Sequence, residues 1–411
     1  MKVLALGGSG GMGRFAVRTA STFSGIDSLV VADLEAPAAE AFAATLPDHV
    51  RGIGLDVTDG KALRGAMAKA DVVLNTTGPF FKFAVPILQA AIESGCHYLD
   101  ICDDWEPTLD MFAMDEAARE AGITAIVGLG ASPGLSNLLA LAAMRELDTV
   151  EEVYTGWDMS GAVPEEESSQ SGPNAAMVHG VQQLTGKVRV QRGGAPEMVR
   201  PLEKVAIDYP GVGKRTAYIF GHPEAVSFPH HYPEVHTSLN VMHGVEGQVW
   251  MLKLIRGAID SGLMSLSRGA AILGWFEGLG APATPESVID PDGLPSIYGL
   301  AVGTRGSARA SVAACFGSIG DVSMGFVTGV PLACGLELLL KGSLTQHGVL
   351  APESGAIDPH EFFTLLDGKE GSGDGIGGVG GSSAEVLVLT RSWDPDARKS
   401  YRESLAKALG E

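Results

Sequence analysis

The sequence predicts an α/β protein in which a doubly wound parallel sheet comes first and a second, mixed α/β domain follows. Three observations support this prediction. Apolar strand-like runs alternate with Ala- and Leu-rich helical patterns over residues 2–130, as they do in βαβ units. A glycine cluster separates the first apolar run from the first helical pattern. Beyond residue 140, short strand-like pieces are separated by turn residues, which is typical of a mixed domain.

The composition is that of a globular, acidic protein. The chain has 411 residues, of which 45% are hydrophobic and 19% charged. At roughly 100–200 residues per domain, this length predicts two or three domains. A formal net charge of -20 argues against a nucleic-acid partner, because binding the phosphate backbone requires clustered Lys and Arg. We therefore expect a small-molecule substrate and no nucleic-acid partner.

Cysteine usage and hydropathy bear on the compartment. The four cysteines form no CxxC pair, which argues against a zinc ribbon or a disulfide framework and fits a reducing cytoplasm. The N-terminus lacks the basic region of a signal peptide, and the apolar stretch MLKLIRGAIDSGLMSLSRGAAILGWF contains four charged residues. We therefore expect a cytoplasmic protein with no membrane span.

Six strands are expected in the first sheet, and helical patterns lie between them. The strands are KVLALG, SLVVADL, VRGIGLDV, DVVLNTTG, CHYLDIC and ITAIVGLG. Helical patterns with a period of about 3.6 residues are found in APAAEAFAATL, DGKALRGAMAKA and FAVPILQAAIESG.

The rest of the chain mixes both kinds of element. We expect a helix in NAAMVHGVQQLTG, after the polar loop EEESSQSGP, and strands in KVRVQRG, KVAIDYPG and KRTAYIFG. Residues 251–276 predict one or two amphipathic helices, and IYGLAVGTRGSARASVAACFG predicts two strands joined at GTRGS. A buried helix, VPLACGLELLLKG, then precedes the glycine loop GSGDGIGGVGGSS and a last strand, AEVLVLTRSW.

The glycine cluster has the spacing of a dinucleotide-binding turn. Gly8, Gly10 and Gly13 form a GxGxxG motif between the first strand and the first helix. In such a turn the first glycine permits the tight bend, the second lets the backbone approach a pyrophosphate, and the third lets the helix pack close to the sheet. Free N–H groups at the helix start favour phosphate. The residues expected to line this turn are Gly8, Ser9, Gly10, Gly11, Met12 and Gly13.

Asp33 ends the second strand, about 20 residues after the motif, where a carboxylate accepts hydrogen bonds from ribose hydroxyls. The alternative is a tight turn beside a solvated carboxylate. The charge of Asp33 would repel a 2′-phosphate, and neither Leu34 nor Glu35 supplies a cation to offset it. NAD is therefore favoured over NADP, although a cation at Arg14 could still reach a phosphate.

Two later strand ends complete the expected cofactor site. Asp56 and Val57 follow the third strand, where they meet the adenine edge or form an ordinary strand-end turn. Small and hydroxyl residues follow the fourth strand, and because ligands bind at the carboxyl ends of parallel strands, we expect this loop beside the nicotinamide ribose. It comprises Asn75, Thr76, Thr77 and Gly78.

An acidic cluster follows the fifth strand. Asp100, Asp103 and Asp104 can bind an ammonium group or relay a proton, or one of the last two can cap the next helix. Cys102 is either a polar neighbour of such a site or a small core residue. The catalytic candidates are therefore Cys102, Asp103 and Asp104.

Substrate contacts are expected from three further regions. Ser132, Pro133 and Gly134 precede a long helix, whose free N–H groups face the same sheet edge as the glycine cluster. In the middle domain, His179 and His231 can move a proton near neutral pH. Arg215 offers a planar fork to a carboxylate. For each of these middle-domain residues, the alternative to a substrate contact is an ordinary position on a solvent-exposed face. No HxxxH or HExxH spacing occurs, so we expect no metal.

A family resemblance rests on these same motifs. LGGSGGMG, VADLE, LDVTD, NTTGPF, HYLDICDDWEP and AGITAIVGLGASPGLSNLLA occur in this order, and TGVPLACGLELLLKGSLTQHGVLAPE follows near the end. The chain resembles the saccharopine dehydrogenase-like family, which includes saccharopine reductase and carboxynorspermidine dehydrogenase. The resemblance is specific over the first 140 residues and over residues 328–353, and loose in the middle domain.

The resemblance implies a domain plan. Residues 1–135 would form a Rossmann-type dinucleotide-binding domain, and residues 136–325 a substrate and dimerisation domain of mixed α/β structure. Residues 326–365 would return to the first domain, and residues 366–411 would form the glycine loop, a final strand and a C-terminal helix. A homodimer is also implied.

The resemblance further implies hydride transfer at the C–N bond of a secondary amine, which joins an amino acid or amine to a carbonyl compound, through an imine. By position, Gly8, Gly10, Gly13 and Asp33 would hold the dinucleotide, Asn75 to Gly78 its ribose, and residues 100–104 and 132–134 the reaction cleft. NADP-using members commonly carry Arg where this chain has DLE, which again favours NAD. The alternatives are reduction of a C=C or C=O bond on a more apolar substrate, and a protein that binds NAD without turnover.

Overall fold

The structure, a computed structural model, describes residues 1–159, 175–244, 246–279, 293–317, 323–367, 387–393 and 396–408. The expected loops EEESSQSGP and GSGDGIGGVGGSS lie outside these ranges. Among the described residues the chain divides into two compact units. The first comprises Met1–Leu135 and Ser323–Asp358, and the second comprises the described residues of 136–322 and 359–411.

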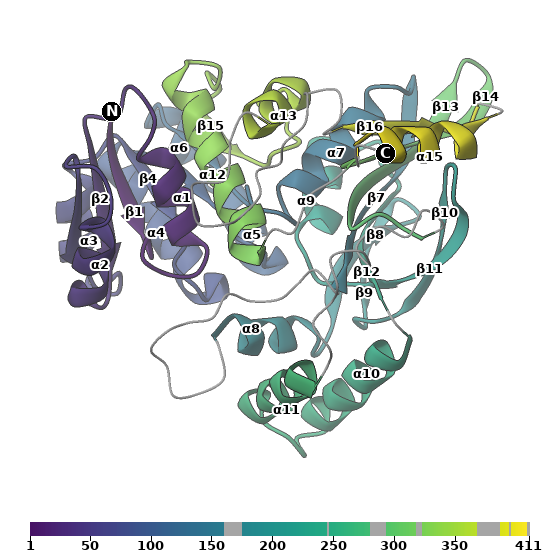
Figure 1. Cartoon of the computed structure of the whole chain (residues 1–411), viewed down its shortest axis with the longest axis horizontal. Coiled ribbons are helices and arrows are strands. Elements are labelled where there is room, and N and C mark those ends of the chain that lie inside the picture. The colour runs from purple at the N-terminus through teal and green to yellow at the C-terminus, as the bar shows by residue number, and fades with distance from the viewer. Residues whose placement is uncertain are drawn as a thin grey trace. The chain divides into compact units, whose positions relative to one another are not determined.

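The first unit is built on a seven-stranded sheet in the order β15-β6-β5-β4-β1-β2-β3, and every neighbouring pair is parallel. Figure 1 labels β1, β2, β4 and β15 of this sheet. Its strands are β1 (Lys2–Leu6), β2 (Ser28–Asp33), β3 (Val50–Gly54), β4 (Val72–Asn75), β5 (His97–Asp100), β6 (Thr124–Ile126) and β15 (Gly348–Leu350). Its helices are α1 (Gly13–Ala20), α2 (Ala36–Ala43), α3 (Gly60–Met67), α4 (Phe80–Ser94), α5 (Trp105–Phe112), α6 (Asp115–Glu120) and α12 (Met324–Leu340).

The apolar runs of the sequence form the centre of this sheet because parallel strands are covered on both faces. The β1 residues Val3 and Leu6 are each 1% exposed, and Val72 and Val73 of β4 are fully buried. All six strands expected in this part of the chain are present, and β15 adds an edge strand beside β6.

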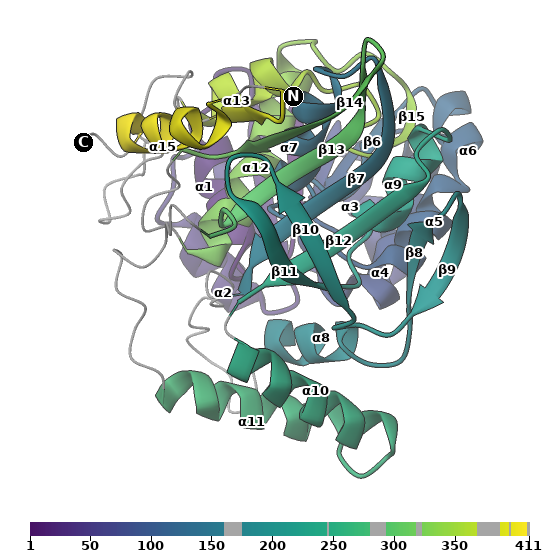
Figure 2. The same ribbon diagram turned by 90° about the vertical axis from the view of Figure 1, so that its right-hand side faces the viewer.

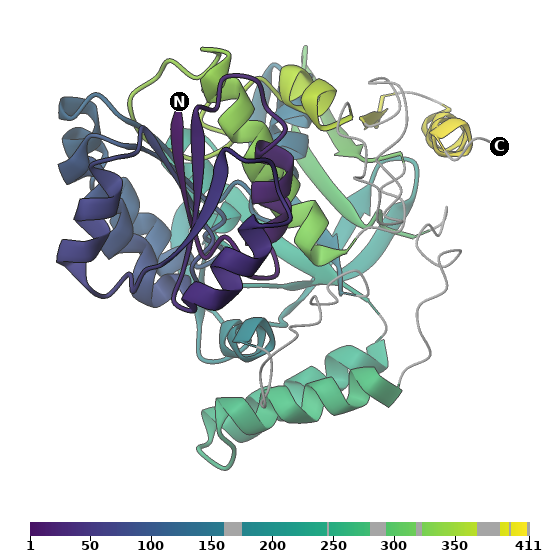
Figure 3. The ribbon, with the colours of Figure 1, turned by 60° about the vertical axis from the view of Figure 1, so that its left-hand side comes forward.

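The helix α12 returns from the C-terminal part of the chain to pack on α1 (Figure 3). The Ser323 hydroxyl accepts the N–H of Phe326 at 3.3 Å and so caps α12. Phe326 then meets Phe15 edge to face, with ring centroids 6.3 Å apart. A Cβ at Gly329 would meet the backbone of Met12 and Ala16, so this glycine permits the close approach. The return segment therefore supports the helix that follows the glycine cluster.

The second unit contains a nine-stranded mixed sheet (Figure 2). Its strands are β7 (Thr149–Asp158), β8 (Val188–Arg192), β9 (Ala195–Val199), β10 (Lys204–Tyr209), β11 (Gly213–Ile219), β12 (Thr237–His243), β13 (Ile297–Arg305), β14 (Ala308–Cys315) and β16 (Val388–Arg391). Its helices are α7 (Leu135–Met144), α8 (Ala175–Gln183), α9 (Glu224–His231), α10 (Glu246–Asp260), α11 (Leu266–Leu279), α13 (Pro359–Asp367) and α15 (Ala397–Ala408).

The middle-domain predictions are confirmed where the sequence pattern was clear. β13 and β14 pair as the expected antiparallel hairpin, and residues 251–276 fall in two helices, α10 and α11. A buried cluster of Val181, Ile255 and Ala270 holds α8, α10 and α11 together. The parallel sheet and the second, mixed sheet confirm the predicted fold class.

Two features of the second unit were not anticipated. The strands β7, β9 and β12 were missed, and β7 pairs with β12 in parallel and with β13 in antiparallel orientation. Residues 359–365, which the sequence analysis grouped with the first domain, lie in the second unit. There Phe363 of α13 packs edge to face on Phe316, with the ring centroids 5.7 Å apart. No helix in the described ranges is long and apolar enough to cross a membrane.

Candidate functional site

The carboxyl ends of β1, β2, β4, β5 and β6 meet at one edge of the first sheet. The strand register places Leu6 beside Asn75, and Asn75 beside Asp100. On the other side of β1, Leu6 lies beside Ala32. Loops that are far apart in the sequence therefore become neighbours at this edge, which is where open parallel sheets bind ligands.

The glycine cluster forms a tight turn directly after β1. Gly7 adopts a positive φ of 68°, and its N–H donates to the Ala32 carbonyl at 2.9 Å. The Gly10 N–H then donates back to the Gly7 carbonyl at 3.0 Å. The tight bend thus begins at Gly7, one residue before the first glycine of the motif, because only glycine adopts that backbone conformation without strain.

The other glycines of the motif leave room for close approach. A Cβ at Gly13 would meet the Gly7 carbonyl oxygen and would lie 2.6 Å from Thr76 Oγ1. At Gly10, the only described atom within 4 Å of such a Cβ, apart from those of its chain neighbours, is the Gly7 oxygen, at 3.2 Å. Gly13 therefore lets α1 start against the sheet, and Gly10 leaves one side of the turn open.

No side chain of the N-cap residue Met12 caps α1. The N–H groups of Arg14, Phe15 and Ala16 donate instead to the backbone carbonyls of Gly10 and Met12. The positive end of the helix dipole and the open side of Gly10 fit the pyrophosphate of a dinucleotide. The residues present therefore fit the predicted cofactor.

Asp33 is joined to the glycine turn. Its Oδ2 accepts the Ser9 hydroxyl at 2.6 Å and its Oδ1 accepts the Leu34 N–H at 2.8 Å. The carboxylate is thus fixed at the end of β2, where a ribose would lie. Leu34 is 67% exposed, and its apolar side chain at this position suits the face of an adenine ring. The sequence motif predicted for Leu34 only the lack of a positive charge.

Asp56 forms a turn of its own after β3. Its Oδ1 accepts both the N–H and the hydroxyl of Thr58, at 2.8 Å and 2.7 Å. These hydrogen bonds lower the pKa of Asp56, with a smaller contribution from Lys82. Asp56 is therefore held in a turn at the end of β3, and the neighbouring Val57 is half-buried.

The loop after β4 contacts the glycine turn. Thr76 Oγ1 lies 3.0 Å from the carbonyl oxygens of both Leu6 and Gly7. Asn75 is fully buried, and its Oδ1 accepts the Thr77 N–H at 3.0 Å. Thr76 and Thr77 of the expected ribose loop therefore lie against the glycine turn.

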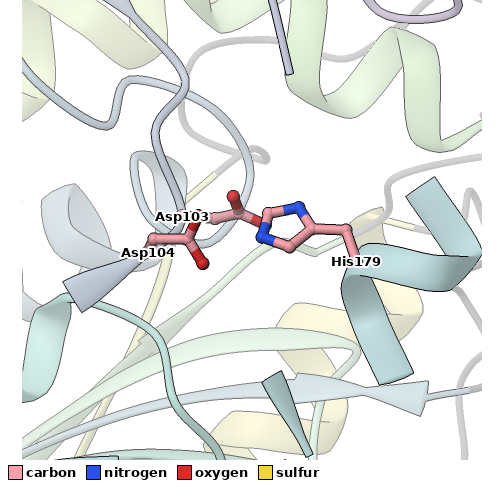
Figure 4. A group of neighbouring side chains, drawn as sticks. All are labelled: Asp103, Asp104 and His179. Carbon is pink, nitrogen blue, oxygen red and sulfur yellow. The ribbon is translucent and has the colours of Figure 1, made fainter. Parts of the chain in front are cut away.

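The acidic residues after β5 differ in their surroundings, and Figure 4 shows Asp103 and Asp104 where that strand ends. Asp104 accepts the Phe81 N–H at 3.0 Å, at the start of α4. It does not cap α5, whose N-cap position it occupies. Asp103 is half-buried. Cys102 is fully buried, and burial raises the pKa of its thiol well above its usual value, so this thiol stays neutral.

The residues 132–134 form a loop that folds back on Gly130. The Gly130 N–H donates to the Pro133 carbonyl at 2.9 Å, and the Leu135 N–H donates to the Gly130 carbonyl at 2.9 Å. Gly134 has a positive φ of 123°, and a Cβ there would meet the Gly130 backbone. The expected substrate loop is thus compact and lies at the edge that carries the glycine turn.

The middle-domain candidates belong to the second unit and lie on three separate elements. His179, also drawn in Figure 4, comes from α8. Arg215 is in β11, where it pairs with Ile207 of β10. His231 is the last residue of α9, and its ring packs edge to face on that of His230, with the ring centroids 4.9 Å apart. All three are half-buried.

Known proteins resemble this chain over both units. Residues 3–126 match the model of the saccharopine dehydrogenase NADP binding domain. A carboxyaminopropylagmatine dehydrogenase of Synechocystis sp. is 23% identical over 314 residues, which are 72% of this chain and 77% of that protein. A saccharopine dehydrogenase (NADP(+), L-glutamate-forming) of Pyricularia oryzae is 29% identical over 124 residues, which are 30% of this chain and 26% of that protein.

The fold is also that of a solved relative. Apo saccharopine dehydrogenase (L-Glu forming) from Saccharomyces cerevisiae matches with a TM-score of 0.60 and 18% identity, over 95% of this chain and 99% of that one. The motif resemblance is confirmed by the family model and the curated relatives. This chain therefore resembles the saccharopine dehydrogenase-like oxidoreductases, and its residues 3–126 match their NADP binding domain.

Proposed function

We propose that this oxidoreductase acts at the C–N bond of a secondary amine and interconverts it with an amine and a carbonyl compound. In the reductive direction, an amine R–NH2, a carbonyl O=CR′R″, NADH and a proton give R–NH–CHR′R″, NAD+ and water. The observation that carries the proposal is the half-buried carboxylate of Asp103 at the carboxyl edge, one strand away from the loop of residues 75–78. A carboxyl group there can move the proton that the condensation and its reversal require.

The chain's residues would divide the work as follows. A bound dinucleotide supplies the hydride. The glycine turn and the α1 N-terminus hold its phosphates, Asp33 its adenosine ribose, and the loop of residues 75–78 its nicotinamide ribose. The loop of residues 132–134 and Asp103 would face the amine. His179, Arg215 and His231 remain candidates for binding the rest of the substrate.

The relative from Synechocystis supports an amine substrate. Its name describes agmatine that carries a carboxyaminopropyl group, an amine linked to an amino-acid chain. The net charge of -20 would favour the approach of a cationic amine. We therefore expect one partner to be a diamine, agmatine or a basic amino acid, and the other to be a carbonyl compound bearing a carboxylate.

We further propose that NAD is preferred over NADP. The carboxylate of Asp33 is held by Ser9 and by the Leu34 N–H, and a 2′-phosphate would meet this fixed negative charge. Titration of the purified protein with NADH and with NADPH, followed by nucleotide fluorescence, should give the smaller Kd for NADH. An equal or smaller Kd for NADPH would refute the preference.

A substrate screen tests the proposed reaction. Amines and basic amino acids are paired with 2-oxo acids and aldehydes, NADH loss is followed by absorbance, and products are identified by mass. A secondary amine product supports the proposal. Reduction of the carbonyl compound alone to an alcohol would instead favour a carbonyl reductase. Tight NADH binding without turnover of any pair would favour a protein that only binds the nucleotide.

A homodimer, a cytoplasmic location and the absence of a nucleic-acid partner belong to the same proposal. The acidic net charge supports the last of these, and the family resemblance supports the dimer. Light scattering of the full chain measures its mass in solution, and the mass of a single chain would contradict the dimer.

A further inference from the structure

A buried carboxylate lies at the carboxyl edge of the first sheet, where the loops after β4, β5 and β6 meet. Asp100 ends β5 and is fully buried. Its Oδ1 accepts the N–H groups of Cys102 at 3.0 Å and Gly128 at 2.7 Å. Its Oδ2 accepts the Tyr98 hydroxyl at 2.7 Å. One side chain therefore binds residues that follow β5 and β6.

The hydrogen bonds continue from Tyr98 to the loop after β4. The Tyr98 oxygen accepts a hydrogen bond from Asn75 Nδ2 at 2.9 Å, and Asn75 Oδ1 accepts the Thr77 N–H at 3.0 Å. Every donor in this series points toward Asp100, so the carboxylate polarises the whole chain of bonds in one direction.

This series of bonds reaches the cofactor turn. Thr76, beside Thr77, contacts the carbonyls of Leu6 and Gly7 through its hydroxyl. A Cβ at Gly7 would already be 3.0 Å from the Thr76 carbonyl, so little space separates the two loops. A shift of the loop after β4 would therefore displace the glycine turn.

A second series leads to the expected substrate loop. The Leu129 N–H donates to the carbonyl of Asp100 at 2.7 Å, beside the Gly128 bond to the carboxylate. Gly130 is in turn bound to Pro133. The backbone after β6 is thus held to Asp100 at two successive residues before it turns back at residues 132–134.

The chemistry of Asp100 fits a role beyond packing. Burial raises the pKa of this carboxyl to about 6, and the three hydrogen bonds that it accepts oppose the rise. It is therefore mostly ionised at neutral pH, although a buried charge costs stability. An apolar residue would avoid that cost but would leave the donors on Tyr98, Cys102 and Gly128 without their acceptor.

We propose that Asp100 is a positioning residue for hydride transfer. Through Tyr98 and Asn75 it holds the loop of residues 75–78 against the glycine turn, and through Gly128 it holds the loop that leads to residues 132–134. The inference rests on dinucleotide binding and not on the proposed C–N chemistry, because its first test measures NADH affinity without turnover.

Tyr98→Phe is the most selective test, since it keeps the ring and removes only the hydroxyl that joins Asn75 to Asp100. We expect the Kd for NADH to rise about tenfold. That factor corresponds to the loss of the hydrogen bond from the Tyr98 hydroxyl to the Asp100 carboxylate, together with the bond that the hydroxyl accepts from Asn75. With the amine and carbonyl pair that turns over, KM for NADH should rise in parallel while kcat stays within about twofold.

Asp100→Asn tests the carboxylate from which both series of hydrogen bonds start. The amide keeps the shape of the carboxylate but places an NH2 group against one of the three donors. Both loops should loosen, so kcat should fall together with NADH affinity. Because Tyr98 acts through Asp100, adding Tyr98→Phe to this variant should not raise the Kd for NADH further.

Val72→Ala is the matched control. Val72 is fully buried at the amino end of β4, where it pairs with His97. Truncating its side chain therefore weakens the same sheet at the end opposite the carboxyl edge. Unfolding should occur at lower temperature while the Kd for NADH is unchanged. An unchanged NADH Kd in Tyr98→Phe, or an equal rise in Val72→Ala, would overturn the proposal.

Discussion

The Ser9 hydroxyl donates a hydrogen bond of 2.6 Å to Asp33, and this bond joins the glycine turn to the end of the next strand. The second carboxylate oxygen of Asp33 accepts the Leu34 N–H. The carboxylate is therefore fixed by its neighbours before a nucleotide arrives. Cofactor choice should follow from this pair and from the uncharged, exposed side chain of Leu34.

Replacing Asp33 by Ser and Leu34 by Arg together should reverse the cofactor preference. The change removes the repulsion of a 2′-phosphate and adds a cation to bind it. We expect NADH affinity to fall about tenfold and NADPH affinity to rise, as measured by nucleotide fluorescence. Ser9→Ala is the comparison, because it should weaken NADH binding while leaving NADH preferred. A double variant that still prefers NADH would show that Asp33 does not set the choice.

Gly13→Ala should impair cofactor binding. The added Cβ would meet the Gly7 carbonyl and lie 2.6 Å from Thr76 Oγ1, so the glycine turn and the loop after β4 must move apart. We expect the Kd for NADH to rise by about tenfold or more.

Gly65→Ala is the matched control for that variant. Gly65 lies inside α3, and apart from its chain neighbours and the backbone of this helix no described atom is within 4 Å of a Cβ built there. Alanine should stabilise the helix by about 1 kcal/mol and leave NADH binding unchanged. Equal binding by the two variants would mean that the close approach at Gly13 is not needed for the cofactor.

Asp103→Asn and Asp104→Asn should differ in their effects. Asp104 accepts the Phe81 N–H at the start of α4, and an amide oxygen can replace that acceptor, so Asp104→Asn should be nearly silent. Loss of an acid or base at Asp103 should lower kcat by about a hundredfold or more. Steady-state rates with the best substrate pair measure both, and full activity of Asp103→Asn would remove this residue from the proton transfer.

His97 should make the stability of the first unit pH-dependent. Burial lowers the pKa of His97, and His347 lowers it further, while Asp71 acts in the opposite direction. The Thr124 N–H donates to its Nδ1 at 3.0 Å, which requires a neutral ring nitrogen. The unfolded chain therefore binds a proton before the folded one does, and the free energy of unfolding should fall as the pH drops below about 6.5.

His97→Asn isolates this contribution. The amide oxygen can accept the Thr124 N–H without titrating, and His243, whose pKa is also lowered by burial, stays in both proteins. Urea unfolding should show a smaller loss of stability between neutral and mildly acidic pH in the variant. The same loss in both proteins would assign the pH dependence to other groups.

The first unit was predictable because its signals are local. The GxGxxG spacing and the position of Asp33 lie within one βαβ unit, where chain order fixes which groups meet. Apolar runs likewise identified six strands, since strands buried on both faces are continuously apolar. β9 was missed because its side chains are mostly exposed, and its sequence lacks that pattern.

The hydrogen bonds around Asp100 were beyond sequence analysis for a different reason. The period of two residues in a strand places Tyr98 and Asp100 on one face, but their meeting with Asn75 depends on the register of β4 against β5. The same holds for His179, Arg215 and His231, whose residue types suggested chemistry but which the fold distributes over α8, β11 and α9.

Hydride transfer at a C–N bond is the central claim, and an isotope experiment tests it most directly. NADH deuterated at its transferable position is incubated with the protein and the best amine and carbonyl pair, and the products are analysed by mass spectrometry. We predict a secondary amine that carries deuterium on the carbon bonded to nitrogen. Deuterium found only in an alcohol derived from the carbonyl compound would contradict the claim.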